Sequence, residues 1–338
     1  MPIIKFNTMD FGTYETAVVI SGINQTNTAN NKPMLKITIS DGDETITALK
    51  FDSTKADLAA GGIEEGSTAQ VALEITDYKG SKSYRIVSVT PVKLPDEELK
   101  QLITLPPEDP DKLVNDILIM IKQSSGREYD LTNISVPDDD FSITALTVRL
   151  LTQYLKAFTK SSAAKAMHHN IYGGLAYHTH RMIKTAYAVC GVYTLLNREL
   201  LVCGTALHDI GKIVEMKTSD TGIAAYTDMG NLFGHPLLGI ELIDHEYWRQ
   251  KEINGNSYNS EEIAMLKHML ASHHGQPEWG AIRMPSTPEA MILHELDMID
   301  SRMYMYEEGL ASTKPGSVSD YINGIAGDGR STIYRPQE

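Results

Sequence analysis

Cysteine is scarce in this chain of 338 residues. It occurs only as Cys190 and Cys203, and both lie in apolar segments with helical spacing. Two such residues do not form a disulfide framework, so we expect two buried, reduced thiols. Hydrophobic residues make up 42% of the chain, which is enough for cores that hold without disulfides.

Long apolar runs are also missing. No stretch approaches the roughly 20 apolar residues that a membrane-spanning helix needs. The opening residues, Met1–Phe6, do not resemble a secretory signal. We therefore expect a cytoplasmic protein with no membrane partner. The length favours roughly two domains.

Positive charge is in deficit. The formal net charge is −14 at pH 7, which argues against a general binder of polyanions, because that affinity comes from clustered lysine and arginine. The deficit is uneven. Residues 1–95 carry nine basic and eleven acidic residues, whereas residues 96–140 carry four basic and twelve acidic ones. The N-terminal part is therefore nearly neutral.

Histidine is absent from the first 167 residues, and all eleven histidines lie between residues 168 and 294. Among them is the sequence His208-Asp209-Ile210-Gly211-Lys212. The apolar stretch Leu200–Leu207 predicts a buried helix that ends at His208. If that helix continues, Lys212 projects to the same face as the His-Asp pair. Gly211 has no side chain, which lets a substrate or a second helix approach closely.

The His-Asp pair belongs to an ordered series of histidines and acids, which is typical of a site for divalent metal ions. The other members are His178, His235, His273-His274 and, after His294, either Asp297 or Asp300. The two aspartates share one helical face, so periodicity does not choose between them. His178 and His180 are two residues apart, so at most one of them faces the cluster.

This series resembles the HD-domain metal-dependent phosphohydrolases and, within them, the 3′-5′ exoribonucleases of the YhaM type. The resemblance covers most of residues 160–305 and extends more weakly to the N-terminal part. Its motifs are Ala163–Asn170, Gly173–Leu175, His208-Asp209, Glu215, Tyr226, Gly230–His235, Leu270–Gly275, Glu278–Gly280, Glu289-Ala290, His294 and Asp297. It implies an enzyme that removes nucleotides from the 3′ end of single-stranded RNA, with single-stranded DNA as a further substrate.

The resemblance also implies a centre for two divalent ions. The first ion is held by His178, His208, Asp209 and Asp297. The second is held by His235 and His273, with Asp209 as the bridge and His274 as a candidate for a further ligand. Manganese is the family expectation, and iron, zinc, nickel or cobalt also suit the mixed nitrogen and oxygen donors.

Such a centre needs no serine or cysteine nucleophile, because two ions lower the pKa of a bridging water and neutralise phosphoryl charge. The expected catalytic residues are Asp209 and Lys212. Lys212 is placed to meet a phosphate oxygen or the leaving group as a compact cation.

Before residue 96 the hydrophobic pattern changes to the period of β-strands. Met34–Ser40 alternates apolar and polar residues, and Asp41-Gly42-Asp43 predicts a hairpin turn into Thr45–Phe51. Further strands are expected at Tyr14–Ile20, Val71–Ile75 and Tyr84–Val89, and a short helix at Ser53–Ala60. Five strands with this helix predict an OB-type barrel.

An OB barrel binds single strands by stacking bases on aromatic rings while basic side chains follow the phosphates. The candidates in this barrel are Phe51, Tyr78 and Tyr84, with Lys36, Lys50, Lys82 and Arg85. The alternative for each ring is a place in the barrel core or in a hairpin.

We therefore expect an N-terminal all-β OB-type barrel (1–95), a proline-rich linker (96–110), an all-α HD-domain helical bundle (111–308) and a C-terminal extension (309–338). The bundle should begin with helices at 111–123 and 142–159. The extension should be loose or should contact a second copy. The alternative functions are hydrolysis of small nucleotides or cyclic dinucleotides, a non-catalytic nucleic-acid-binding regulatory factor and, more remotely, a diiron oxygenase. A barrel in front of the HD site favours a polymer.

Overall fold

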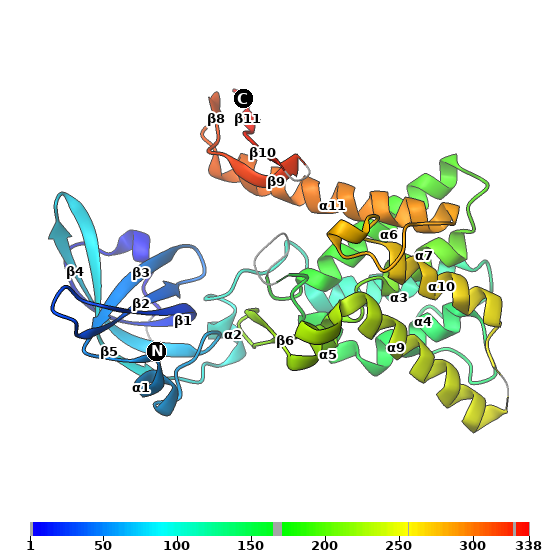
Figure 1. Ribbon diagram of the computed structural model, residues 1–338, viewed down its shortest axis with the longest axis horizontal. Helices are drawn as coiled ribbons and strands as arrows, with labels where there is room; N and C mark the ends of the chain where they lie inside the picture. Colours follow the sequence, from blue (N-terminus) through cyan, green and yellow to red (C-terminus); the bar gives the residue numbers. More distant parts are fainter. Residues whose placement is uncertain (1–2, 165–170, 256, 327–328, 338) are drawn as a thin grey trace. The chain divides into compact units, whose positions relative to one another are not determined.

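The computed structural model describes residues 3–164, 171–255, 257–326 and 329–337 (Figure 1). The chain divides into two compact units. Unit 1 comprises Met1–Pro107 and Thr218–Ala225, and unit 2 comprises Glu108–Lys217 and Tyr226–Glu338. Because the second segment of unit 1 interrupts unit 2, three chain connections join the two units.

Unit 1 contains a closed five-stranded barrel. Its strands are β1 (Gly12–Asn27), β2 (Pro33–Ser40), β3 (Thr45–Phe51), β4 (Thr68–Tyr78) and β5 (Ser81–Pro91), in the order β1-β2-β3-β5-β4. The helix α1 (Lys55–Ala60), capped by Thr54, connects β3 to β4. This strand order and helix confirm the predicted OB-type barrel.

The strand β1 closes the barrel, because its first half pairs with β4 and its second half with β2. It is longer than the predicted Tyr14–Ile20, and its pairing with β2 has a register shift between Ile20 and Gly22. On β2, Leu35, Ile37 and Ile39 are buried in the barrel and Lys36 is exposed, as the alternation predicts.

The chain after β5 stays packed within unit 1. Leu94 and Leu102 are buried in a cluster with Ala17 and Val19, and the short helix α2 (Asp96–Leu99) lies between the two leucines. The same cluster receives Ile223 from the hairpin β6 (Met216–Thr218) and β7 (Ala224–Tyr226). The segment 96–110, expected as a linker, thus carries a helical turn and a buried leucine.

Unit 2 is predominantly helical, which confirms the predicted bundle. Its helices are α3 (Pro110–Ser124), α4 (Ile143–Gln153), α5 (Leu155–Lys160), α6 (Gly174–Val192), α7 (Arg198–Leu207), α8 (Lys212–Glu215), α9 (Asp228–Asn254), α10 (Ser260–Ser272) and α11 (Pro288–Ser312). The helix predicted at 142–159 is interrupted at Tyr154, where α4 ends and α5 begins.

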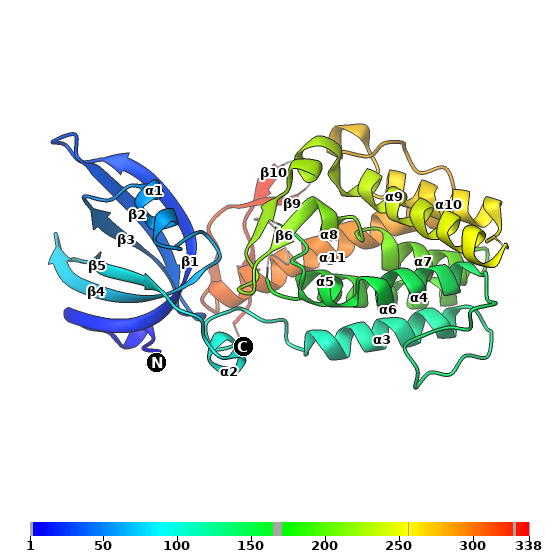
Figure 2. The ribbon, with the colours of Figure 1, turned by 90° about the horizontal axis from the view of Figure 1, so that it is seen from below.

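The helix α7 lies in the middle of the bundle (Figure 2). It packs against α3, α4, α6, α10 and α11, and every residue from Leu200 to Leu207 is buried. A helix that is covered on all sides needs apolar or small residues all round. This position explains the unbroken apolar sequence before His208.

Gly211 lies where α9 crosses the turn after α7. A Cβ atom at this residue would lie 2.0 Å from the carbonyl oxygen of His235 and 2.6 Å from the backbone nitrogen of Gly239. No side chain fits there unless α9 moves. The expectation that Gly211 admits a second helix is confirmed.

The substitution Gly211→Ala should lower the free energy of unfolding by about 1–3 kcal/mol or more, because it overpacks this crossing. Gly191→Ala is the matched control, since a Cβ atom on Gly191 meets nothing within 4 Å. It should be neutral or slightly stabilising, because alanine favours helix over glycine. Urea denaturation measures both variants, and equal stabilities would refute the close-packing argument.

The C-terminal segment, expected to be a loose extension, packs on α11. It forms two antiparallel pairs, β8 (Ser317–Val318) with β11 (Tyr334–Arg335) and β9 (Ile322–Ala326) with β10 (Gly329–Ser331). Ile325 and Ile333 are buried, and Gly309 faces the side chains of Ile322 and Ile333. Strands this short leave no hydrophobic period in the sequence.

Two further expectations concern thiols and membranes. Cys203 is fully buried, and burial raises the pKa of its thiol to about 12. Cys190 is only partly buried, and both cysteines are free. Among the described residues, no helix combines the length and the apolar character needed to cross a bilayer.

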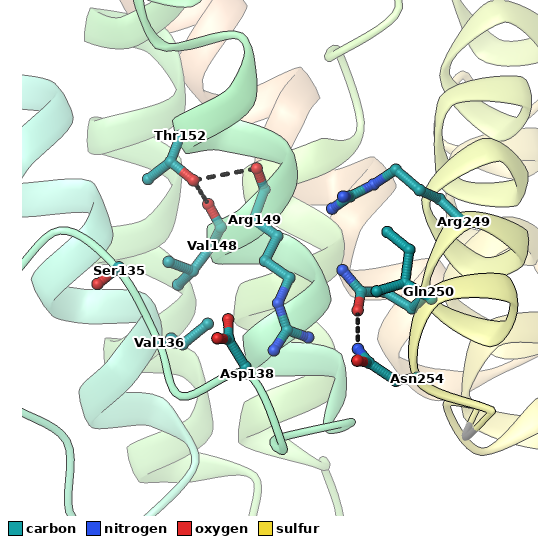
Figure 3. Close-up of a pocket in the computed structure, with 10 residues that line it drawn as sticks. Ser135, Val136, Asp138, Val148, Arg149, Thr152, Arg249, Gln250 and Asn254 are labelled. Carbon is teal, nitrogen blue, oxygen red and sulfur yellow. Dashed lines mark hydrogen bonds between the residues drawn. The ribbon is translucent and has the colours of Figure 1, made fainter.

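A cavity of about 320 Å³ lies between α4, α9 and the loop before α4 (Figure 3). Its arginines already have partners. Arg149 donates to the carbonyl oxygens of Asp140 and Pro137 and to the hydroxyl of Tyr258, and Arg249 pairs with the buried Glu246 at 2.7 Å. These bonds tie the loop to the bundle and explain the polar lining structurally.

Candidate metal centre

The structure brings together all seven side chains predicted as metal ligands. They come from α6, α9 and α11 and from the turns that follow α7 and α10. Six of them form two triads, His178, His208, Asp297 and His235, His273, His274. Within each triad, the possible ligand atoms all lie within 4.8 Å of one another.

Asp209 lies between the two triads and is 3% exposed. Its Oδ1 is 3.2 Å from Nε2 of His235 and 3.8 Å from Nε2 of His273. Its Oδ2 is 3.3 Å from Nε2 of His208 and 3.9 Å from Nε2 of His178. Each carboxylate oxygen thus faces one triad, which is the arrangement that a bridging ligand requires.

Two of the histidines are oriented by the helices that they terminate. Nδ1 of His208 lies 2.8 Å from the carbonyl oxygen of Thr205, and Nδ1 of His273 lies 2.7 Å from that of Leu270. These carbonyls belong to last turns, where the helix provides no backbone donor. When Nδ1 donates to them, Nε2 is left as a lone-pair donor that points into the cluster.

Carboxylates orient the other two inward-pointing histidines. Asp300 Oδ2 lies 2.7 Å from Nδ1 of His178, and Arg181 fixes Asp300 through a 2.6 Å bond to Oδ1. Glu215 Oε2 lies 3.1 Å from Nδ1 of His235, and its Oε1 accepts the backbone N–H of His235 at 3.0 Å. The geometry therefore places Asp297 in the triad and Asp300 behind His178, a choice that periodicity left open.

A kink in α9 presents His235 to the cluster. Gly234 has φ 71° and ψ 157°, which interrupts the helical conformation. Positive φ is readily adopted by glycine, and Pro236 cannot donate a helical hydrogen bond. The sequence Gly234-His235-Pro236 therefore breaks the helix where the ligand is needed.

The pKa of His178 in one triad and that of His274 in the other are shifted in opposite directions. Burial disfavours a charged His178, but Asp297 and Asp300 outweigh it and raise the pKa of His178 to about 9. Burial, helped by His235, lowers the pKa of His274 to about 4. Because a ligand imidazole must be neutral, binding of a cation by His178 releases a proton at neutral pH, whereas His274 is neutral already.

Lys212 lies against Asp209, although the helix α7 does not continue to it. The chain turns after Leu207 through i to i−3 hydrogen bonds before α8 begins at Lys212. Nζ of Lys212 donates to Oδ2 of Asp209 at 2.6 Å. Despite burial, which opposes both shifts, this pairing lowers the pKa of Asp209 and raises that of Lys212. The helix thus ends at His208 as predicted, and the turn after it still directs the ammonium to the cluster.

The remaining histidines lie outside the two triads or outside the described residues. His180 is buried on α6, away from the two triads. Nδ1 of His294 lies 2.8 Å from the carbonyl oxygen of His273, so His294 packs directly behind a cluster residue. His168 and His169, which belong to the motif Ala163–Asn170, are not among the described residues.

The candidate strand-binding residues of the barrel differ in how far their side chains are exposed and in their contacts. Phe51 is 38% exposed with Arg85 over its ring at 5.7 Å, and the strand register places Lys36 on the same outer face. Tyr78 is exposed at the β4–β5 turn, while Tyr84 packs partly against the barrel core. Lys50 and Lys82 donate to the carbonyl oxygens of Val87 and Met9.

Glu215 was part of the sequence motif without an assigned role, and its contacts with His235 give it one. Glu215→Gln removes the negative charge but keeps an oxygen that can accept the backbone N–H of His235. Metal affinity should fall about 10- to 100-fold, as it does when such partners of ligand histidines are changed. Titration calorimetry with Mn²⁺ measures the loss, and an unchanged affinity would show that Glu215 has no part in holding His235.

Together, the helical bundle, the His208-Asp209 pair and the paired histidine triads define a metal-dependent HD-domain protein. In agreement, the family model described as HD domain matches residues 175–302. Divalent metal binding follows from this class.

The similarity to curated proteins extends beyond that domain. The chain is 30% identical over 309 residues to the 3′-5′ exoribonuclease YhaM of Listeria monocytogenes serotype 4b (strain CLIP80459), which covers 91% of this chain and 90% of the relative. It is 32% identical over 321 residues to the 3′-5′ exoribonuclease YhaM of Geobacillus sp. (strain WCH70), with 94% and 90% covered. The chain belongs to the YhaM family of 3′-5′ exoribonucleases.

Part of the chain can also be compared with a solved structure. It is a mitochondrial single-stranded DNA-binding protein from S. cerevisiae, 17% identical, with a TM-score of 0.22. The match covers 26% of this chain and 100% of that chain. A likeness this weak supports no argument about binding.

Proposed function

We infer that this chain is a metal-dependent 3′-5′ exoribonuclease that hydrolyses single-stranded RNA from its 3′ end. The observation that carries this inference is Asp209, whose two oxygens face two separate triads of ligand-type side chains. The membership of the chain in the YhaM family supplies the substrate and the direction of hydrolysis. Single-stranded DNA is a second candidate substrate of the same site.

We propose that the triads hold one divalent ion each and that Asp209 contacts both ions. The residues fit this role, because Nε2 of His178, His208, His235 and His273 points inward. In addition, the buried Nδ1 of His274 has no hydrogen-bond partner among the described residues, and an orphaned buried nitrogen suits a ligand. The family resemblance favours manganese, and iron, zinc, nickel and cobalt are alternatives that also suit the mixed imidazole and carboxylate donors.

Divalent ions bound at such a centre supply a hydroxide near neutral pH and neutralise charge on the phosphoryl group. The protein contributes fixed ligand orientation, since Asp300 and Glu215 hold two of the imidazoles. Lys212 contributes a cation beside Asp209. We propose that this ammonium stabilises charge on the phosphoryl oxygens or the leaving group.

The decisive experiment incubates the manganese-loaded full chain with 5′-labelled RNA, 3′-labelled RNA, matching DNA and a panel of small nucleotides. We expect a descending ladder from the 5′ label and immediate release of a mononucleotide from the 3′ label. Turnover restricted to a small nucleotide or a cyclic dinucleotide would favour the first alternative. Binding of RNA without any hydrolysis would favour the regulatory factor.

We propose the barrel (1–95) as the domain that binds the RNA strand and the bundle (111–308) as the catalytic domain. Phe51→Ala should raise KM for long RNA by about 5- to 150-fold, because stacking contributes about 1–3 kcal/mol per base. Phe11→Ala is the matched control, since Phe11 is also exposed in unit 1 and is no strand-binding candidate. If both variants behave like the unmodified chain, Phe51 does not bind the strand.

Location and assembly are further proposals. The relatives are bacterial ribonucleases and both thiols are free, which supports a cytoplasmic location. A homo-oligomer is supported by Ile299, Met303 and Tyr306, which form an exposed apolar stripe on α11. Sedimentation velocity of the full chain tests the assembly, and a monomer at micromolar concentration would refute it.

A further inference from the structure

A cavity of about 200 Å³ opens beside the metal centre, within unit 2. Its lining residues are His273, His274, Trp279, His294, Asp297, Met298 and Gly324. Three of them belong to the triads. The other four are Trp279 with its indole, His294 with a second aromatic ring, Met298 with a thioether and Gly324, which has no side chain. None of these four has a role in holding metal.

Trp279 is held in a fixed position at this cavity. It ends the short helix η2 (Pro277–Trp279) and stacks on His294, with ring centroids 6.0 Å apart and planes at 27°. His294 is in turn anchored on the carbonyl oxygen of His273 at 2.8 Å. A continuous chain of contacts therefore links the indole to a residue of the second triad.

Two glycines bring the loop close to the rings. A Cβ atom on Gly275 would lie 2.4 Å from the His294 ring, and one on Gly280 would lie 3.0 Å from Nδ1 of His274. Both glycines have positive φ, at 78° and 100°, so other residues would be strained there. The loop is thus folded tightly against the aromatic rings, which makes Trp279 a rigid platform.

The indole is nevertheless 44% exposed. A single exposed tryptophan needs no explanation by itself. This one is backed by a second ring and lines a cavity next to the site that acts on the phosphodiester. Flat aromatic surfaces of this kind bind unstacked bases of single-stranded nucleic acids.

We propose that this cavity binds the base of the 3′-terminal nucleotide, with Trp279 as the stacking platform and His294 as the ring behind it. The proposal rests on the function inferred above. It has two consequences for specificity. Stacking tolerates all four bases, because every base has a π-face. A terminal base must also leave its pairing partner to enter the cavity, so the site itself selects an unpaired 3′ end.

A double-change experiment tests the contact directly. In the full manganese-loaded chain, Trp279→Ala should raise KM for single-stranded RNA about 5- to 150-fold with metal content unchanged. RNA with an abasic 3′-terminal residue should raise KM of the unmodified chain by a similar factor. Combining the variant with abasic RNA should add little, because both changes remove the same contact.

Trp248→Ala is the matched control. Trp248 is 55% exposed on α9, where it packs against Tyr247, and it does not line the cavity. Its replacement should leave both KM values unchanged, and Trp279→Phe should recover part of the loss. If the effects of Trp279→Ala and of the abasic end multiply, Trp279 does not contact the terminal base and the proposal is overturned.

Fluorescence tests stacking without hydrolysis. Trp248 and Trp279 are the two tryptophans of the chain, so Trp248→Phe leaves Trp279 as the single indole emitter. RNA with a hydrolysis-resistant terminal phosphorothioate should quench this emission, and its abasic counterpart should not. Equal quenching by both RNAs, or none, would refute the base site. Absence of any RNA shortening by the unmodified chain would instead refute the proposed function, whatever the fluorescence shows.

Discussion

Asp209→Asn should abolish stable metal binding and lower kcat by several orders of magnitude, while the helical bundle remains folded. Among the residues that the structure describes, Asp209 is the one carboxylate whose two oxygens face both triads, at 3.2 Å from His235 and 3.3 Å from His208. An amide provides a single neutral oxygen in their place. It cannot bridge two cations or neutralise their charge, so the centre loses its common ligand.

Metal analysis after dialysis, activity on RNA and far-UV circular dichroism measure the three parts of this expectation. Asp244→Asn is the matched control, because Asp244 pairs with Lys267 at 2.7 Å on the surface of the bundle. A surface pair of this kind contributes about 0–1 kcal/mol, so the control should keep its metal and its activity. Two ions per chain and full activity in Asp209→Asn would exclude Asp209 as the ligand common to both ions.

Helix geometry predicted the helix end that carries the His-Asp pair, whereas the family resemblance implied the full ligand set. His208 and Asp209 lie at the end of an apolar helix, and the histidines at 235 and 273 also lie at a helix kink and a helix end. Helix ends leave polar groups unpaired, so they are where a ligand can be oriented. The barrel was equally predictable from the sequence, because the alternation of apolar and polar residues and the turn residues are local signals.

The sequence could not predict the partners behind the ligands. Asp300 contacts a histidine 122 residues away, and Glu215 contacts one 20 residues away. Such pairs depend on how α6 meets α11 and how α8 meets α9, and packing angles leave no period in a single sequence. Trp279 and His294 illustrate the same limit, because their stacking is visible only once the loop after α10 is folded.

The backbone after α7 is determined by tertiary contacts with α9 and not by local sequence alone. The apolar helix was predicted to end at His208, and α7 does end there, because Gly211 is in contact with the backbone of His235 and Gly239 and the chain tightens into a turn. The turn brings Lys212 onto Asp209 itself. Lys212 therefore lies beside the His-Asp pair on a backbone that differs from the continued helix assumed in the spacing argument.

Lys212→Ala should lower kcat on RNA by about a hundredfold or more, with both ions retained. The Lys212 ammonium lies 2.6 Å from Asp209, and that carboxylate raises the pKa of Lys212 although burial opposes the shift. The Lys212 ammonium of the unmodified chain is therefore charged across the neutral range. A change of pH within that range should not restore the kcat of the variant. Alanine removes the cation but leaves every ligand atom of the triads in place.

The division between kcat and metal content decides what Lys212 does. If it stabilises charge on the transferring phosphoryl group, kcat per metal-loaded site falls while metal content and KM stay close to those of the unmodified chain. Lys156→Ala is the matched control, since Lys156 is exposed on α5 and should change none of these values. Metal loss with a normal rate per loaded site would instead assign Lys212 to positioning Asp209, because removing the ammonium would then release the bridge and leave the chemistry intact.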